Sequence, residues 1–252
     1  MELLSPTHDP ATVRDLRVEM AVLHRAAAAH GFNEGIDNHF SLALPGRDDL
    51  FLLNRYGPHW AEMRAADILT IDLDGNVVDG HGSWEVTAFM IHRAVHRAAP
   101  GARCVLHTHM PYATALSMTV EGLDTRASQN AMYFHGRIAR APYGGLADGS
   151  AEGDRLGAAV TEGAWVVMLD NHGVLVIGET PAAAWQRLYF LERACEAQVL
   201  ARSTGAEPIR VPEAVAQHTA AQFASDSGEG ADLLLAAERR LLDRDNPGYD
   251  AG

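Results

Sequence analysis

Two histidines separated by a single residue, His107 and His109, close a run of apolar residues that begins at Cys104. Side chains at positions i and i+2 of an extended segment point to the same side, so both imidazoles can reach one ion. A third histidine, His172, stands later in the chain, in a predicted tight turn between two apolar strands. Three neutral imidazoles with one open position form a catalytic zinc site, and iron, cobalt or manganese would also fit. The pattern therefore predicts a divalent metal ion bound by His107, His109 and His172.

The number of histidines leaves alternatives open at this point. The chain has 13 of them, so a chance pair with this spacing is not rare. His92 and His96, four residues apart on a predicted helix, form a second possible metal pair. We expect them instead to pack or to hydrogen-bond behind the metal ligands. His24 is expected at the surface or in a local hydrogen bond.

The basic residues exclude several reaction types. All 20 of them are arginine, because the chain contains no lysine. A Schiff-base aldolase, a pyridoxal-phosphate enzyme and a P-loop all require a lysine, so none of them can be built here. Any carbonyl chemistry would need another activator. A net charge of −13 argues against nucleic acid or an anionic membrane as a partner and leaves a small molecule as the expected ligand.

Apolar periodicity and turn residues predict the elements that would position these histidines. We expect a helix over 11–30, strands near 39–44 and 49–54, a hairpin over 68–80, and a helix over 83–99 with Ser83 as its N-cap. A buried strand should lead into His107, followed by a helix over 111–118. Two strands should flank the turn at 171–173, before a long helix over 181–202. The last part, 211–244, reads as helical, and residues 246–252 as a frayed tail. The simplest interpretation is one α/β domain.

The compartment is predicted from what the chain lacks. Cys104 and Cys195 form no CxxC pair, and no transmembrane run is present. The first ten residues have neither a basic region nor an apolar core of a secretion signal. We therefore expect a protein of the reduced cytoplasm.

The segments that carry these histidines resemble the class II aldolase/adducin family. HRAVHRAAPGARCVLHTHMPYATALS (residues 92–117) is similar to the family's helix–strand–HxH–helix core, and LDNHGVLVIG (169–178) to the strand with its third histidine. DILTIDLDGNVVDG (67–80) is similar to its hairpin, and Asn38 stands in the place of its Gly/Asn phosphate loop. The resemblance spans about residues 12–204. It implies one three-layer α/β/α domain over 1–252 with a largely antiparallel central sheet, and sites between the subunits of a homotetramer.

The family resemblance also implies a mechanism. The metal, zinc first with Fe²⁺, Mn²⁺ or Co²⁺ as alternatives, binds the substrate carbonyl as a Lewis acid and stabilises an enediolate while a carboxylate moves the proton. The chain would then be a divalent-metal-dependent lyase acting on a small hydroxy-carbonyl or oxo-acid. The family's aldolases carry this Glu four residues before the helix histidine, which is Ala88 here. Glu85, one turn earlier, is the candidate catalytic residue, or only a favourable charge at the helix N-terminus.

The predicted substrate-binding residues also depart from the aldolases. Arg55 stands where they have a phosphate-binding turn, and it could clamp a carboxylate as readily as a phosphate. A single Ser83 replaces their paired serines. Tyr133 is the candidate for a tyrosine over the site, although a core or interface aromatic is the simpler interpretation. Asn38 completes the predicted set. Three further aromatic residues could line the pocket but are expected in the core: Trp60, Trp84 and Phe134.

Two other functions remain open. Some antibiotic-pathway proteins of this family are non-haem iron oxygenases with oxidative decarboxylation, and the loss of the aldolase Glu and phosphate loop favours that branch. An adducin-like, non-enzymatic binding module is the third hypothesis. The presence of all three histidines argues against it.

Overall fold

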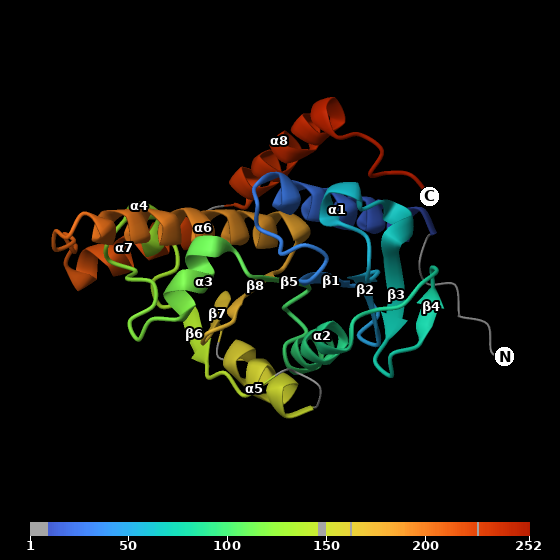
Figure 1. The fold of residues 1–252 in the computed structure, drawn as a ribbon, viewed down its shortest axis with the longest axis horizontal. Helices are drawn as coiled ribbons and strands as arrows, with labels where there is room; N and C mark the ends of the chain where they lie inside the picture. The colour runs from blue at the N-terminus through green and yellow to red at the C-terminus, as the bar shows by residue number, and fades with distance from the viewer. Residues whose placement is uncertain (1–9, 146–149, 162, 226) are drawn as a thin grey trace.

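One mixed sheet runs through the centre of the molecule (Figure 1). The computed structural model describes residues 10–145, 150–161, 163–225 and 227–252. Its eight strands follow the order β4-β3-β2-β1-β5-β8-β7-β6. All neighbours are antiparallel except β6 and β7, which are parallel. The predicted α/β domain with a largely antiparallel sheet is confirmed. The strands are β1 (His39–Ala43), β2 (Leu50–Asn54), β3 (Ile68–Asp72), β4 (Val77–Asp79), β5 (Cys104–Thr108), β6 (Ile138–Ala141), β7 (Val166–Leu169) and β8 (Gly173–Gly178).

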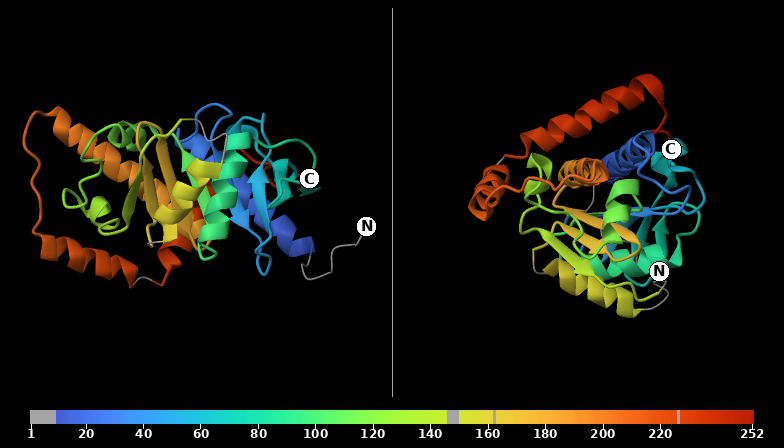
Figure 2. Two further views of the ribbon diagram at one scale, coloured as in Figure 1. Left: turned by 90° about the horizontal axis from the view of Figure 1, so that it is seen from below. Right: turned by 60° about the vertical axis from the view of Figure 1, so that its left-hand side comes forward.

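Helices cover both faces of this sheet and give the three layers that were expected. In Figure 1, α1, α3 and α6 lie above the strands, and α2 and α5 lie below them. Figure 2 shows α7 and α8 outside the layer formed by α1 and α6. No helix among the described residues is both long and apolar enough to cross a membrane. The helices are α1 (Pro10–Ala29), α2 (Val86–Ala98), α3 (Pro111–Ser117), α4 (Gln129–Met132), α5 (Ser150–Thr161), α6 (Pro181–Ser203), α7 (Glu213–Ala224) and α8 (Glu229–Asp245), with 3₁₀ turns at Trp60–Glu62 and Ala65–Asp67.

Side-chain alternation along β1 and β5 decides which residues face α2. Phe40 on β1 and Leu106 on β5 join the core under α1 and α6. Val105 packs into the second core, under α2 and α5. Because successive strand residues point to opposite faces, His107 shares the face of Val105, and His39 lies on that face beside it. The sheet therefore gathers these histidines on the α2 side.

The start of α2 differs from the prediction. Glu85 is the N-cap, and its carboxylate accepts a hydrogen bond from the Ala88 amide at 2.8 Å. Ser83, the predicted cap, is exposed. Trp84 explains the difference: its Nε1 donates to the Gly75 carbonyl at 3.0 Å, which holds the segment before the helix against the β3–β4 hairpin. The helix therefore begins only after this contact.

The C-terminal residues are ordered, so the expectation of a frayed tail is wrong. Arg25 on α1 donates to the carbonyl oxygens of Asn246 at 2.8 Å and Pro247 at 2.9 Å. The Ala65 amide donates to the Tyr249 carbonyl at 2.7 Å, and the Tyr249 ring is buried. A buried guanidinium needs several acceptors. The tail supplies them and is held in place by doing so.

Candidate metal centre and its cavity

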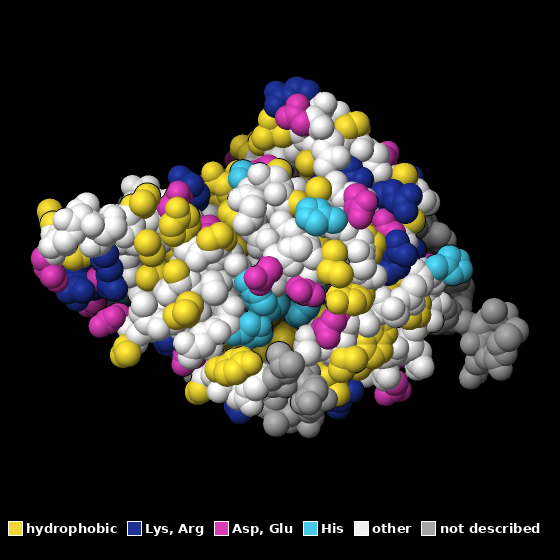
Figure 3. All heavy atoms as spheres, in the orientation of Figure 1, with side chains coloured by type: hydrophobic (Ala, Val, Ile, Leu, Met, Phe, Trp, Pro, Cys, Tyr) yellow, Lys and Arg dark blue, Asp and Glu magenta, His cyan; other side chains and the backbone are white. Residues whose placement is uncertain are grey.

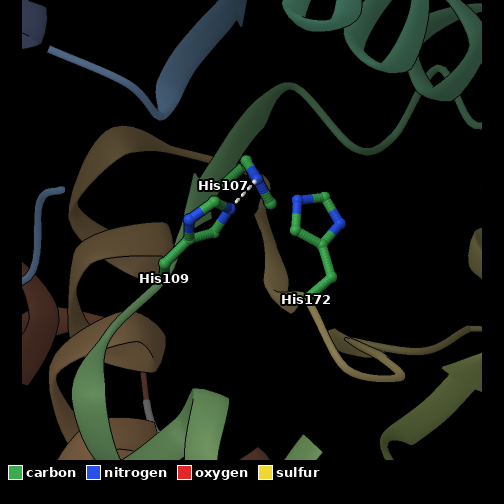
Figure 4. Close-up of side chains that lie close together, drawn as sticks. All are labelled: His107, His109 and His172. Atoms are coloured by element: carbon green, nitrogen blue, oxygen red, sulfur yellow. Dashed lines mark hydrogen bonds between the residues drawn. The ribbon is translucent and has the colours of Figure 1, made fainter. Parts of the chain in front are cut away.

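The three predicted ligands meet at one point at the end of β5 and in the β7–β8 turn (Figure 4). One ring nitrogen from each of His107, His109 and His172 lies within 4.8 Å of the others. The Nε2 atoms of His107 and His109 are 3.1 Å apart. Two imidazoles bound to one ion at about 2.1 Å would place their nitrogens about 3.0–3.4 Å apart, depending on the coordination geometry. The arrangement therefore fits a divalent metal ion.

The other nitrogens of His107 and His109 are already occupied, which orients the free ones. His107 Nδ1 faces the Val174 carbonyl oxygen at 3.1 Å. His109 Nδ1 hydrogen-bonds to the Glu34 carboxylate. Each ring therefore keeps Nε2 for an ion. Hydrogen bonds of this kind fix the tautomer and orientation of metal-binding histidines in proteins.

Local backbone features place His172 beside the other two ligands. Asn171 has a positive φ of 57°, which Asn tolerates in a tight turn. At Gly173 a Cβ would lie 2.6 Å from the Thr108 carbonyl oxygen, so only glycine permits this close approach of the turn to β5.

Burial keeps His107 in the form that binds metal. Burial lowers the pKa of the His107 imidazole well below its usual value, and the neighbouring His39 lowers it further. A neutral imidazole carries the lone pair that coordinates an ion. His107 is therefore ready to bind without first losing a proton.

The three histidines lie in a cavity of about 490 Å³. Figure 3 shows histidine side chains gathered in a hollow of this face, with acidic side chains around it. Two of the other predicted site residues, Asn38 and Glu85, also line it. The full lining is Ile36, Asp37, Asn38, His39, Asn54, Tyr56, Glu85, Thr87, Ala88, Ile91, His107, His109, Tyr143, Gly145, Asn171 and His172.

Asn38 connects the loop before β1 to the metal centre. It has a positive φ of 84°, and its Oδ1 accepts from the Glu34 amide at 3.0 Å and from the His109 amide at 3.4 Å. Its Nδ2 is buried without a hydrogen-bond partner among the residues that the structure describes. A donor left in this state at the wall of a cavity is suited to a ligand oxygen.

Glu85 reaches the cavity from the N-terminus of α2. Its Oε2 atom accepts from both the Thr87 hydroxyl and the Ala88 amide. For Oε1 no partner is present within the described part of the chain. The carboxylate thus caps the helix with one oxygen and keeps the other available.

The remaining three predicted residues do not line this cavity. The Arg55 guanidinium pairs with the Asp67 carboxylate at 2.7 Å, beside a neighbouring hollow. Ser83 is exposed and does not line the cavity. The Tyr133 hydroxyl donates to Gln186 at 3.1 Å, within an aromatic cluster on the α4–α6–α7 side. Trp60 and Phe134 are fully buried, Trp84 packs against the Phe89 ring, and none of these three aromatic residues lines the cavity.

From the sequence, His39 was a residue that could line a pocket or cap a loop, and the structure places it in the cavity wall. Two other residues near the three histidines were missed. Tyr143 places its ring 6.2 Å from that of His172, and nothing in its sequence context indicated this. Glu34 lies in an irregular loop, and its contact with His109 depends on a fold that brings together residues 75 positions apart.

Comparisons with known proteins agree on one family. Residues 18–199 match the model of the Class II Aldolase and Adducin N-terminal domain. A putative aldolase class 2 protein of Caulobacter vibrioides is 36% identical over 92% of this chain and 91% of its own. A Streptomyces roseochromogenus protein, 4-hydroxy-3-prenylphenylpyruvate oxygenase/4-hydroxy-3-prenylbenzoate synthase, is 32% identical over 83% of this chain and 76% of its own. The structure of L-fuculose 1-phosphate aldolase from Glaciozyma antarctica aligns with a TM-score of 0.80 at 23% identity, over 97% of this chain and 96% of that one.

Proposed function

The chain belongs to the class II aldolase and adducin family, and on this premise we propose that it is a divalent-metal-dependent lyase. Its substrate would be a small hydroxy-carbonyl compound or oxo-acid, cleaved or formed at the bond next to the carbonyl. The observation that carries the proposal is the convergence of three imidazole nitrogens within 4.8 Å in an open cavity.

His107, His109 and His172 would hold the ion, with zinc first and Fe²⁺, Mn²⁺ or Co²⁺ as alternatives. When bound, the ion supplies a Lewis acid for the substrate oxygens. Glu34 keeps the His109 ring in the orientation that ligation needs. The buried Nδ2 of Asn38 offers the substrate a hydrogen bond.

Glu85 is the proposed proton acceptor. Its Oε2 is held by the Thr87 hydroxyl and the Ala88 amide, while Oε1 can face a substrate proton from the cavity wall. A base must lie within hydrogen-bond reach of the proton that it removes, and a fixed helix N-cap keeps this group in one place. The contact between Glu85 and the substrate is part of this proposal.

The charges around the cavity argue against a phosphorylated substrate. Asp37 and Glu85 line it, whereas no arginine within the described part of the chain does. The undescribed residues contain no basic side chain other than His8, and the chain has no lysine. A phosphate dianion would meet acidic groups with no cation of this chain to pair with except the metal. We therefore favour a substrate without a phosphate.

A second candidate function is oxygenase chemistry with decarboxylation. The Streptomyces relative named above is an oxygenase by its name and shares 32% identity with this chain. Ala88 stands where the family's aldolases carry their Glu, which also fits this branch. An adducin-like binding module is a third hypothesis, against which the intact histidine triad argues. Assembly as a homotetramer, a cytoplasmic location and a single domain over 1–252 stay predictions.

The test begins with the metal content of protein purified without added ions. We expect about one divalent ion per chain and its loss in His107→Ala, because a remaining pair of imidazoles binds more weakly. His218→Ala, at an exposed position on α7, should retain the ion. Full metal content in His107→Ala would refute both enzymatic proposals.

A second measurement separates the two chemistries. The metal-loaded protein is incubated with 2-oxo and hydroxy acids, with and without oxygen. Release of an aldehyde under anaerobic conditions supports the lyase. Oxygen consumption with no anaerobic turnover would overturn it in favour of the oxygenase.

A further inference from the structure

The cavity that holds the three histidines also has apolar side chains in its inner wall. Ala88 and Ile91, one turn apart on α2, both line it. They are only 2% and 1% exposed, so they belong to its inner part. Figure 3 shows apolar side chains, in yellow, next to the histidines of this hollow. The α2 wall of the cavity therefore presents hydrocarbon to a ligand.

Three larger apolar side chains line the same cavity nearer to solvent. Ile36 precedes β1, Tyr56 follows β2 and Tyr143 follows β6. They are 36%, 43% and 50% exposed. Single exposed apolar residues are common on protein surfaces and need no explanation. Their convergence from three separate segments on one concave wall is typical of a ligand site.

The polar side chains of the lining mostly have partners within the protein already. Asn54 Oδ1 accepts from a β1 amide at 3.1 Å, and the Thr87 hydroxyl donates to Glu85. His39 Nδ1 lies 2.7 Å from His92 Nε2. Two further polar residues of the lining are exposed to water, Asp37 and Asn171. A substrate with a row of hydroxyl groups would therefore exchange its bonds to water for few new hydrogen bonds here.

We propose that the substrate carries a hydrocarbon group, aryl or alkyl, and that Ile36 and Tyr143 are specificity-determining residues that receive it. The inference rests on the proposed function for the other half of the substrate, the hydroxy-carbonyl or oxo-acid end. The Tyr143 ring lies 6.2 Å from that of His172, so the hydrocarbon group would begin within a few bonds of the end held at the histidines. The cavity of about 490 Å³ lies in the range of small-molecule sites, about 300–1,000 Å³, and leaves room beyond a three-carbon acid.

The release of water explains why such a group would be selected. Ile36, Tyr56 and Tyr143 are partly exposed, and a ligand group that covers them removes apolar surface from water on both sides of the contact. Burying a group of the size of a phenylalanine side chain strengthens binding by about tenfold to a hundredfold. Hydroxyl groups placed against the same surface would lose their bonds to water without replacement. The apolar wall thus disfavours a sugar-like substrate, independently of the acidic groups that disfavour a phosphate.

The first test compares ligands that share one metal-binding group, a 2-hydroxy acid. Lactate, 3-phenyllactate, 2-hydroxy-4-methylpentanoate and 2,3,4-trihydroxybutanoate are titrated into the zinc-loaded protein and followed by calorimetry. We expect 3-phenyllactate to bind about thirtyfold and the methylpentanoate about tenfold more tightly than lactate, because each buries apolar surface. The trihydroxy acid should bind no more tightly than lactate. Equal affinities for lactate and 3-phenyllactate, binding of neither, or tightest binding of the trihydroxy acid would overturn the proposal.

The second test assigns the contact to the mouth of the cavity. Ile36→Ser and Tyr143→Ser should each lower the preference for 3-phenyllactate over lactate about fivefold, with unchanged metal content. Ile209→Ser and Val120→Ser alter side chains that are 90% and 93% exposed and do not line the cavity, so they should keep the full preference. All four positions are exposed, and circular dichroism checks that each variant is folded. A preference that survives intact in both Ile36→Ser and Tyr143→Ser would refute the role of these residues.

The inference and the proposed reaction fail in different ways. A preference for 3-phenyllactate without any release of aldehyde from oxo or hydroxy acids would count against the lyase alone. It would leave the apolar wall as a surface that binds hydrocarbon groups. Release of aldehyde together with equal binding of lactate and 3-phenyllactate would keep the lyase and refute the apolar specificity.

Discussion

The free energy of unfolding should decrease as the pH is lowered, because of His24. This residue was expected at the surface or in a local hydrogen bond, but it is fully buried in α1 between Phe40 and Trp60, with ring centroids 4.8 Å and 4.7 Å away. Its Nδ1 lies 2.7 Å from the Met20 carbonyl oxygen, which confirms the local bond and not the exposed position. Burial lowers the pKa of His24 from 6.5 to about 4. The folded protein therefore holds a neutral ring where the unfolded chain binds a proton.

The sign and size of the effect follow from these two pKa values. Above pH 6.5 the His24 ring is neutral in both the folded and the unfolded state, so it does not make the free energy of unfolding depend on pH. As the pH falls from 6.5 towards 4, only the unfolded chain takes up the proton, so the free energy of unfolding decreases. Below pH 4 the free energy of unfolding is lower than at neutral pH by about 3 kcal/mol. At pH 5.5 it is already lower by about 1.4 kcal/mol.

The assay is urea unfolding between pH 7.5 and 5.5, with EDTA present so that metal release does not contribute. His24→Leu keeps an apolar side chain at the position and removes the titrating group. Its loss of stability over this range should be smaller than that of the unaltered protein by about 1.4 kcal/mol. His218→Leu, exposed on α7, should lose as much as the unaltered protein. The reasoning is refuted if His24→Leu and the unaltered protein lose the same amount.

Three further substitutions test other parts of the structure. Glu34→Gln removes the charge behind His109 and should weaken metal binding about tenfold, measured in competition with a chelator. An unchanged metal affinity would show that the Glu34 contact does not orient His109. Glu192→Ala leaves two amides at the start of α3 without their acceptor, each now bonded at 2.8 Å, and should lower the free energy of unfolding by about 2–3 kcal/mol in urea. Tyr249→Ala removes a buried ring of the C-terminal segment and should cost about 3 kcal/mol in the same assay, whereas a loss below about 0.5 kcal/mol would mean that the tail adds no stability.

The parts of the site that could be predicted from the sequence depend on local rules. The two-residue period of a strand placed His107 and His109 on one face, and the structure brings both to His172. The turn between two apolar strands indicated a fixed position for His172, and the pairing of β7 with β8 confirms that turn. Each of these predictions needed only the backbone geometry of one segment and its neighbours.

The parts that could not be predicted depend on contacts between distant segments. Arg55 has the chemistry of an anion clamp, but the fold sets it against Asp67, and that pair uses its charge. Tyr133 lies in an aromatic cluster with members from α6 and α7, which agrees with its simpler interpretation as a core or interface aromatic and not with a place over the site. His92 and His96 were expected to pack or to hydrogen-bond behind the metal ligands, and both form buried hydrogen bonds. Their partners His39 and Ser41 could not be predicted, because these contacts depend on the packing of α2 against β1. Residue type predicts what a side chain can do, and its tertiary partners decide whether it does so.

Glu85 shows how one carboxylate can serve both structure and chemistry. If it were only a helix cap, replacing it by an equally good N-cap would be harmless, because Asp, Ser and Asn cap helices about equally well. If it also moves a proton, the position of Oε1 matters, and a shorter Asp withdraws that oxygen from the cavity. Glu85→Asp should therefore keep the stability of α2 within about 0.5 kcal/mol while lowering turnover much more than substrate affinity. Glu85→Gln should keep the helix cap and lose the proton transfer, since its amide oxygen can still accept from the Ala88 amide but is a far weaker base. Activity retained in both variants would leave Glu85 with the structural role alone and assign the proton to another group on the cavity wall.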